Sequence, residues 1–374
     1  MSKRSYIHLL ILAVLGLILY SNALGSPFVY DDEWYILKNL HIRDLSNFLG
    51  LSGTRYVTLL SFAMNYAIGG YDPLGYKLTN IFIHIINSML LYSTASLIIK
   101  TPVIRGDYEG RGIGALPIIC ALIFLVHPIE TQAVNYVTQR FASLATLFYL
   151  LSVACFLKAR LSSLDGSGSS RYLFYAISLI AAATAQVTKE ISFTLPVIIV
   201  LFEFVFFTGS EGVKKRVLYL IPFLLPLVII PAILFMPGSE NGDHVLTVAG
   251  KLKSLQVQEL KELSRYSYLY TEFRVIVTYL RLLILPINQN LLYDYPMYHS
   301  LFAPQVFVSF IFLASIFSAA LYWLIRSRKR RDALGIMLSI GILWFFVTIS
   351  IESSVIPIKH VIFEHRLYLP SVGF

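Results

Sequence analysis

The amino-acid sequence predicts an all-α protein that crosses a membrane several times. Of its 374 residues, 57% are hydrophobic and only 14% are charged, whereas soluble domains carry about 25% charged residues. The mean hydropathy is +0.70. Long apolar segments alternate with short segments rich in Lys and Arg, which is the pattern that membrane topology produces.

About nine apolar segments are predicted as transmembrane helices, because a helix of about 20 residues crosses the hydrocarbon core of a bilayer. The segments follow one another without a break in composition, so residues 1–374 are predicted as a single membrane domain. The third to fifth segments are short for a crossing. The nine segments are residues 5–23, 78–99, 112–127, 141–157, 172–188, 191–208, 217–236, 303–325 and 333–351.

The distribution of Lys and Arg predicts the orientation, since cytoplasmic segments are enriched in both. With a cytoplasmic N-terminus, the formal net charge of +9 reflects topology and not nucleic-acid binding. The first segment is predicted as an uncleaved span, with a signal peptide as the alternative. The inner segments are then 1–4, 100–111, 158–171, 209–216 and 326–332, which hold 16 of the 30 basic residues.

Two long loops are predicted on the outer side. Residues 24–77 form an acidic loop in which residues 55–68 are expected to lie as an interfacial helix ending at Gly69-Gly70. Residues 237–302 form the second loop, with a partly inserted helix over 264–285 that ends at Pro286. A surface amphipathic helix is expected before it, from the spacing of Leu252, Leu255 and Leu263.

Three consecutive carboxylates, Asp31, Asp32 and Glu33, follow the first span. Adjacent carboxylates repel one another, which raises the pKa of one of them and suits a general base. A solvated turn that caps a helix is the alternative. In an extended loop the side chains of Asp31 and Asp32 point in different directions. We therefore expect one to face a reacting hydroxyl, with Asp31 preferred, and the other to bind a backbone amide or an arginine.

Arginines and further acids are predicted on the same membrane face. Arginine binds phosphate oxygens in a fork, and a carboxylate accepts a hydroxyl proton, so this mixture suits a substrate with a phosphate and a hydroxyl. Helix capping, a simple Glu130–Arg140 pair and a snorkelling Lys189 are structural alternatives. The candidates are Glu130 as a further base, Arg55, Arg140 and Arg366 as phosphate ligands, and Glu33, His127, Lys189, Arg274 and Arg281 as supporting residues.

No Cys/His cluster has the spacing of a metal site, and no nucleotide-binding loop or nucleic-acid motif is found. Cys120 and Cys155 both lie in apolar segments and are predicted as core residues. Glu203 lies inside the sixth predicted span. An intramembrane acid suggests function, but this one is near the cytoplasmic end, where water is within reach.

Several segments together are similar to a known family. Phe28-Val29-Tyr30-Asp31-Asp32 follows the first span, and His127-Pro128-Ile129-Glu130 forms an outer turn. Others lie at 75–84, 189–196, 279–283, 293–296 and 366–371. In this order they resemble the transmembrane and tetratricopeptide-repeat-containing O-mannosyltransferases and their prokaryotic relatives, which are membrane glycosyltransferases of the C superfamily. Tyr56 stands where the family usually has Pro. The sequence ends at Phe374, before any tetratricopeptide repeats, so a fragment or a short relative is expected.

The resemblance implies an inverting transfer of mannose or another hexose from a polyprenyl-phosphate lipid to a hydroxyl of a protein or glycan on the outer face. Asp31 or Asp32 would be the general base, and Arg55, Arg140 or Arg366 would hold the phosphate. No cofactor is expected, and a divalent metal is not favoured. A prokaryotic chain would lie in the plasma (inner) membrane. A flippase for lipid-linked sugars and a non-catalytic assembly protein are the alternatives.

Overall fold

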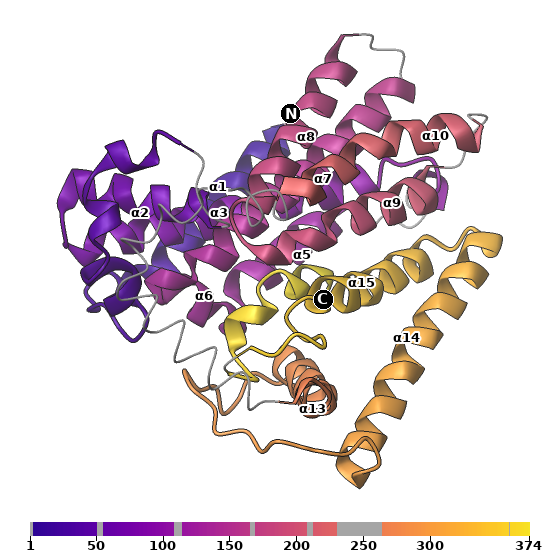
Figure 1. The fold of residues 1–374 in the computed structure, drawn as a ribbon. Coiled ribbons are helices and arrows are strands. Elements are labelled where there is room, and N and C mark those ends of the chain that lie inside the picture. The colour runs from indigo at the N-terminus through magenta and orange to yellow at the C-terminus, as the bar shows by residue number, and fades with distance from the viewer. Residues whose placement is uncertain are drawn as a thin grey trace.

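The computed structural model describes residues 3–50, 55–107, 114–164, 169–207, 212–229, 264–358 and 360–374. Within these residues the secondary structure consists of α-helices and short 3-10 or π-helical turns, without strands. The all-α prediction is therefore confirmed for the described part of the chain. Figure 1 shows the long helices as a bundle, with α14 (Pro304–Arg330) along one edge.

The centre of the bundle is formed by helices that pack against both sequence neighbours and distant partners. The innermost is α7 (Arg140–Leu164), which packs against both α3 and α8. Of its most apolar stretch 78% is buried, against 22% for α1, whose apolar side chains point outward as lipid-facing residues do. The other central helices are α1 (Lys3–Tyr20), α3 (Pro73–Ile98), α5 (Leu116–Val126) and α8 (Ser170–Gln186).

Local sequence explains how α1 and α3 form and meet. The side chain of Asp72 accepts a hydrogen bond from the Leu74 N–H (3.0 Å), and Pro73 occupies a first-turn position where no N–H is needed. Gly16 lies where α1 crosses α3. A Cβ at this position would stand 2.5 Å from Cγ1 of Ile85, so only glycine permits this close approach without movement.

A second group of helices lies beside this centre. α15 (Ala333–Ile349) joins the two hydrophobic clusters, because Trp344 packs in the main one and Phe345 in the smaller one around α13. The remaining helices are α6 (Thr131–Asn135), α9 (Leu195–Phe206), α10 (Val213–Leu220) and α13 (Arg265–Ile284), with short turns η7 (Glu190–Thr194), η8 (Ile221–Val228), η10 (Glu364–Leu367) and η11 (Pro370–Gly373).

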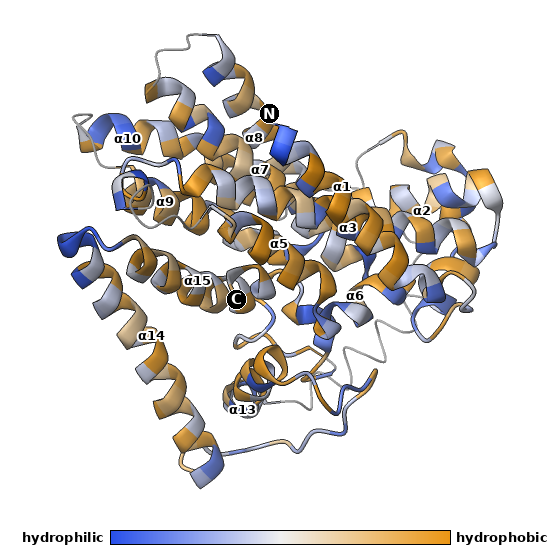
Figure 2. Ribbon diagram, turned by 180° about the vertical axis from the view of Figure 1, so that it is seen from behind, coloured by the Kyte–Doolittle hydropathy of each residue, from blue (hydrophilic) through white to orange (hydrophobic). Residues whose placement is uncertain are grey.

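Nine transmembrane spans are not confirmed. In the described residues, four helices are long and apolar enough to cross a membrane, or five if α5 and the following segment Pro128–Asn135 count as one span bent by 49°. The helices at the other predicted spans are shorter, with 17 residues in α8 and α15 and 12 in α9. The seventh predicted span is described only as far as residue 229. A multi-pass membrane protein remains the conclusion, with Figure 2 showing hydrophobic residues over most long helices.

The helix predicted over 55–68 is confirmed as α2 (Tyr56–Gly69), although its depth relative to a membrane stays a prediction. It ends at Gly70, whose φ of +58° is a conformation that glycine adopts without strain. The helix predicted over 264–285 is confirmed as α13. The amphipathic helix expected around Leu252, Leu255 and Leu263 lies outside the described residues.

Glu203 has a structural explanation. Its buried carboxylate pairs with Arg160 (Nε–Oε2 2.8 Å) and with Arg216 (Nε–Oε1 2.8 Å), which come from α7 and α10. A buried charge is costly unless it is paired and hydrogen-bonded. The two ion pairs therefore explain how the apolar helix α9 tolerates a buried acid. They also link α9 to α7 and α10.

The predicted orientation is testable by cysteine labelling in a variant without Cys120 and Cys155. Leu49 is 89% exposed in the acidic loop, and Lys329 lies in the basic last turn of α14. We expect Leu49→Cys to react with a membrane-impermeant maleimide on intact cells, and Lys329→Cys to react only after permeabilisation, because basic segments remain inside. The reverse pattern would contradict a cytoplasmic N-terminus.

Candidate active site

The three carboxylates of the acidic loop lie in three different environments. Asp32 is completely buried, and its carboxylate accepts hydrogen bonds from the N–H groups of Val29 (3.0 Å) and Thr138 (2.7 Å) and from the Thr138 hydroxyl. Burial raises the pKa of Asp32, although these donors oppose the shift. Asp31 is half-buried. Glu33 is exposed and pairs with Lys38 (2.6 Å), and its supporting role stays a prediction.

The backbone around these acids is turned, not extended as the sequence analysis assumed. Tyr30 has a φ of +50°, which is uncommon for a residue with a side chain, and Asp32 begins a π-helical turn, η2 (Glu33–Leu37). The expectation that the side chains of Asp31 and Asp32 point in different directions stays a prediction. The turn buries Asp32 against Thr138, while the N–H of Asp31 donates to the hydroxyl of Tyr136 (2.7 Å).

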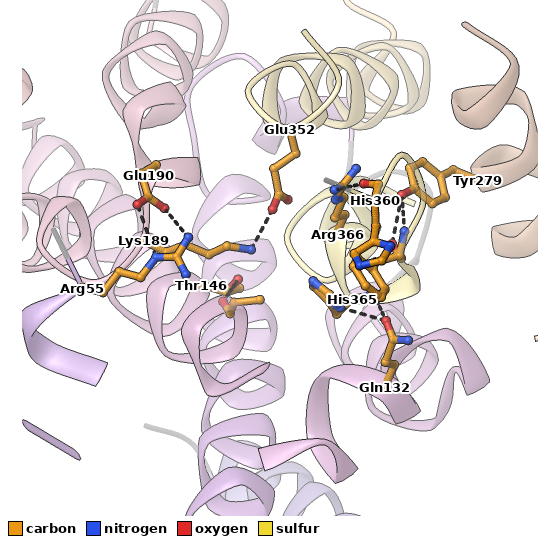
Figure 3. Close-up of polar contacts among 12 residues, drawn as sticks. Arg55, Gln132, Thr146, Lys189, Glu190, Tyr279, Glu352, His360, His365 and Arg366 are labelled. Atoms are coloured by element: carbon orange, nitrogen blue, oxygen red, sulfur yellow. Dashed lines mark hydrogen bonds and ion pairs between the residues drawn. The ribbon is translucent and has the colours of Figure 1, made fainter. Parts of the chain in front are cut away.

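Three cations from distant segments form the feature that we call the cationic cluster: Arg55, Lys189 and Arg366 (Figure 3). Arg55 pairs with Glu190 (Nε–Oε1 3.3 Å), and Lys189 pairs with Glu352 (2.8 Å). The pairs connect the start of α2, the turn between α8 and α9, and the segment after α15. Partial burial opposes ionisation of Glu190, but Arg55 holds the pKa of Glu190 below its ordinary value.

Arg366 is the most enclosed member of the cluster. It donates to the carbonyl oxygens of Val361 (2.9 Å) and His360 (2.5 Å), and its Nη1 lies 3.9 Å from Oε1 of Glu272. Glu272 comes from α13, which is not among the candidate spans, and burial raises its pKa to about 7 even though Arg366 opposes this. At 3.9 Å this pair is longer than the other two pairs of the cluster, so the hold of Glu272 on Arg366 is weak.

Two contacts join the acidic loop to the cationic cluster. The hydroxyl of Tyr30 lies 3.3 Å from Nε2 of His360, whose carbonyl accepts from Arg366. The Nη1 of Arg55 donates to the hydroxyl of Tyr35 (3.4 Å). These two tyrosines flank Asp31 in the chain. The structure thus brings the Asp31 segment beside Arg55 and Arg366, as the sequence analysis expected for one membrane face.

His365 closes another side of the cluster. Its backbone N–H (2.7 Å) and its ring Nδ1 (2.9 Å) both contact Oε1 of Gln132 in α6, as Figure 3 shows. Burial, together with Lys189, Arg366 and Arg55, lowers the pKa of His365 well below its ordinary value. The ring is therefore neutral, and Nδ1 carries its proton because the amide oxygen only accepts.

Arg140, predicted as a phosphate ligand, is enclosed by protein groups. It is completely buried and donates to Oδ1 of Asn80 (2.7 Å), to Oδ1 of Asn65 (2.7 Å), to the carbonyl of Tyr76 (2.8 Å) and to both oxygens of Ser61 (3.1 and 3.2 Å). Its guanidinium also lies over the ring of Phe62 (4.7 Å). Each nitrogen of the Arg140 guanidinium therefore donates to a protein acceptor, which favours a structural role, and its role as a phosphate ligand stays a prediction.

The other predicted residues also make contacts within the protein. Glu130 is completely buried, and neither carboxylate oxygen has a hydrogen bond within the described residues. It does not pair with Arg140, contrary to the structural alternative. His127 accepts from the Ile129 N–H (3.1 Å) and its Nε2 contacts the Leu283 carbonyl (2.9 Å), which fixes the bend after α5. Arg274 donates to Ser309 (3.3 Å), and Arg281 to the Ile287 carbonyl (3.2 Å).

Sequence reasoning missed Glu352, Glu272 and Gln132. Glu352 immediately follows a predicted span. Glu272 lies in the helix predicted over 264–285, for which only Arg274 and Arg281 were taken as candidates. For Glu352, an acid beside a long apolar segment was the available signal, but its partner Lys189 lies 163 residues away in the chain. Among the described residues, no group of three or more His, Cys, Asp or Glu side chains has the arrangement of a metal site; the absence of a cofactor stays a prediction.

The fold and the site define a class: a helical multi-pass membrane protein in which a carboxylate loop adjoins cations suited to an anionic substrate. Comparison with known proteins gives the family that it resembles. The chain is 30% identical over 197 residues to Protein O-mannosyl-transferase tmtc2 of Xenopus laevis, and 28% identical over 207 residues to Protein O-mannosyl-transferase TMTC4 of Homo sapiens. With Protein O-mannosyl-transferase Tmtc2 of Drosophila melanogaster it shares 30% identity over 219 residues.

These matches cover 48%, 50% and 54% of the chain but only 22%, 28% and 22% of the respective relatives. The resemblance to the O-mannosyltransferases that the motifs suggested is confirmed. No family model matches the chain, and no solved structure shows significant similarity to it.

The enclosure of Arg140 predicts a stability defect without a binding defect. Arg140→Ala removes the donor of several buried acceptors, each of which costs about 1–3 kcal/mol when left unsatisfied. We expect the melting temperature in detergent to fall by about 5 °C or more, with the affinity for polyprenyl phosphate unchanged. Arg281→Ala, which removes one exposed hydrogen bond, is the control and should change neither. A folded Arg140→Ala protein of parental stability would contradict the structural role.

Proposed function

We propose that the chain is a membrane glycosyltransferase that moves a sugar, mannose or another hexose, from a polyprenyl-phosphate donor to an acceptor hydroxyl on the outer membrane face. The observation that carries the proposal is the contact of the Asp31 segment with the cationic cluster through Tyr30–His360 and Tyr35–Arg55. The similarity to proteins named O-mannosyltransferases supports sugar transfer as the reaction and mannose as the first sugar to test.

The cationic cluster would hold the donor phosphate. The phosphodiester of a polyprenyl-phosphate sugar carries one negative charge. Its leaving group, polyprenyl phosphate, is a monoester and carries two. Cations fixed at the phosphate therefore stabilise the transition state more than the bound donor, which is the condition for catalysis. Arg55 is partly exposed. Arg366 is buried and donates to the carbonyls of Val361 and His360, but its carboxylate partner Glu272 lies 3.9 Å away, so it is the second proposed ligand. Arg140 is not included, because its donors are occupied.

Asp31 would be the general base. Asp32 already accepts several hydrogen bonds within the protein, so it serves to hold the loop against Thr138. Asp31 is half-buried beside the hydroxyl of Tyr136. Of the two acids, it is the one that is not completely buried, so it is the one that an acceptor hydroxyl can reach. Glu130 is completely buried and lies further along the chain in the turn after α5, so it ranks behind Asp31.

The chemical step follows from these assignments. The carboxylate of Asp31 removes the proton from the acceptor hydroxyl, and the hydroxyl oxygen attacks the anomeric carbon of the sugar. The bond from that carbon to the phosphate oxygen breaks, and its electron pair leaves on polyprenyl phosphate, beside Arg55 and Arg366. Attack opposite the leaving group inverts the anomeric configuration. The proton returns from Asp31 to solvent after product release, and no metal is required in this scheme.

The base assignment predicts different defects for two adjacent substitutions. Asparagine keeps the shape of Asp but accepts no proton, so Asp31→Asn should lower the rate of sugar transfer by about a hundred- to ten-thousand-fold with little change in donor affinity. Asp32→Asn should lower the melting temperature more than the turnover. The measurement is release of labelled mannose from polyprenyl-phosphate mannose by the purified protein.

Parental transfer rates in both Asn variants would exclude the acidic loop as the catalytic centre. A parent protein that binds polyprenyl-phosphate mannose but releases no sugar would favour the flippase or the assembly protein. Glu33→Gln, which changes an exposed acid paired with Lys38, is the matched control and should keep the parental rate.

The phosphate assignment predicts weaker donor binding when either arginine is replaced. Arg55→Gln and Arg366→Gln should each weaken the binding of polyprenyl phosphate by about 1.5–3 kcal/mol, the range for hydrogen bonds to charged groups. Arg55→Gln removes the ion pair with Glu190, so repulsion between the Glu190 carboxylate and the phosphate is a second explanation for weaker binding. The double variant Arg55→Gln/Glu190→Gln removes this repulsion. Arg43→Ala, on the same loop, is the control. Parental affinity in both single variants would reject the cluster as the phosphate site.

A further inference from the structure

The C-terminal end of α14 carries a dense group of cations that the proposed function does not use. Four arginines and one lysine occur between residues 326 and 331, and all five are exposed. Figure 2 shows this end as a hydrophilic tip on an otherwise hydrophobic helix. We call the group the basic end of α14, and it consists of Arg326, Arg328, Lys329, Arg330 and Arg331.

The length of the apolar part of α14 sets the depth of these cations in a bilayer. Residues 306–325 contain no Asp, Glu, Lys or Arg. At a rise of about 1.5 Å per residue they extend for about 30 Å, which equals the thickness of the hydrocarbon core. Arg326 is the next residue, so the basic end begins where the hydrocarbon ends and the lipid headgroups begin.

Two aromatic residues indicate the same depth. Tyr322 and Trp323 are exposed on α14 one turn before the basic end, and Tyr and Trp are enriched at the boundary between hydrocarbon and headgroups. Nη1 of Arg326 donates to the hydroxyl of Tyr322 (3.0 Å), so the first cation is held at the level of this boundary. Headgroup phosphates are therefore within reach of the basic end.

The protein does not neutralise the basic end. Among the residues that the structure describes, none of the five cations takes part in an ion pair. Two acids at the adjoining turn shape the backbone: Asp107 accepts the N–H of Ala333 (2.9 Å), and the N–H of Asp332 donates to the carbonyl of Ser327 (3.0 Å). Five cations against two acids leave an excess of positive charge for anions from outside the chain.

We propose that the basic end of α14 binds the headgroups of acidic phospholipids, in the leaflet that is cytoplasmic in the predicted orientation. A guanidinium binds two phosphate oxygens in a fork, and four of the five cations are arginines. An anionic lipid surface attracts each Lys or Arg near it by about fivefold in affinity. This inference does not rest on the proposed function.

The surroundings of the basic end favour a lipid over a soluble polyanion such as RNA. α14 lies along an edge of the bundle, and only 22% of its most apolar stretch is buried, so acyl chains can lie beside it (Figure 1). A lipid contacts the apolar helix, the exposed aromatic residues and the cations together. α15 begins shortly after Arg331 and packs against α14, so a bound lipid would fix the depth of both helices.

The test measures which lipid surrounds the end of α14. The full chain with Trp34→Phe is reconstituted in phosphatidylcholine vesicles that contain a small fraction of dibrominated phosphatidylglycerol or dibrominated phosphatidylcholine. Bromine quenches tryptophan fluorescence at short range, so quenching reports lipid beside the exposed Trp323, while the buried Trp344 adds a constant signal. We expect a preference for phosphatidylglycerol of about tenfold or more at low salt, and a smaller one at high salt.

Two substitutions separate charge from helix structure. Arg328→Gln/Arg330→Gln should lose most of the preference, since each charge contributes about fivefold, and the three remaining cations still mark the cytoplasmic side. Arg328→Lys/Arg330→Lys keeps the charge and should keep most of the preference. If the double Gln variant loses stability, Arg330→Gln alone gives the same test, with a drop of about fivefold.

Arg43→Gln/Arg265→Gln removes two exposed arginines from other segments and is the matched control, which should keep the parental preference. Equal quenching by the two brominated lipids in the parent would overturn the proposal. An unchanged preference in Arg328→Gln/Arg330→Gln, at the parental melting temperature, would overturn it as well. Equal quenching together with RNA binding that these two Gln substitutions abolish would assign the basic end to nucleic acid instead.

Discussion

The pairing of three cations with carboxylates from other segments is the constraint on which the candidate site depends. Arg55 pairs with Glu190, Lys189 with Glu352, and Arg366 with the more distant Glu272. Charges removed from water persist only when they are paired or hydrogen-bonded. The pairs therefore bring α2, the α8–α9 turn, the segment after α15, α13 and η10 to one place, which no single hydrophobic contact would specify.

The same pairing explains how the cluster would accept a phosphate. Each cation already has a carboxylate partner, so the cluster is close to neutral when it binds nothing. An arriving phosphate diester competes with the carboxylates, and it competes best where the partner is weak. Glu272 lies 3.9 Å from Arg366, which is longer than the other two pairs, so Arg366 has the weakest carboxylate partner of the three cations. The partly exposed Arg55–Glu190 pair provides the second point of access.

Much of this arrangement was predictable from local sequence. Gly69-Gly70 and Pro286 marked the ends of α2 and α13, because glycine and proline act on the backbone directly. The sequence analysis placed the acidic loop, Arg55, Lys189 and Arg366 on one membrane face, and the contacts of the structure bring these segments close together. The roles of these residues in binding and catalysis stay predictions, as does the orientation in the membrane.

The rest depends on tertiary contacts that a sequence pattern does not contain. The hydrogen-bond acceptors of Arg140, such as Asn80 and Asn65, lie 60 and 75 residues away in the chain, so the sequence analysis did not register them when it predicted Arg140 as a ligand. Asp32 is buried by Thr138, 106 residues later. Apolar length also does not register where a helix breaks, as at His127-Pro128, where the chain bends by 49°, and nine spans are not confirmed within the described residues.

A structure of the protein with bound polyprenyl phosphate tests the central claim most directly. The account predicts that the phosphate lies between Arg55 and Arg366, with oxygens within about 3 Å of guanidinium nitrogens of both, and that Arg366 has moved away from Glu272. A phosphate bound instead beside Arg160 and Arg216 at Glu203, with the Arg55–Glu190 and Lys189–Glu352 pairs unchanged, would contradict it.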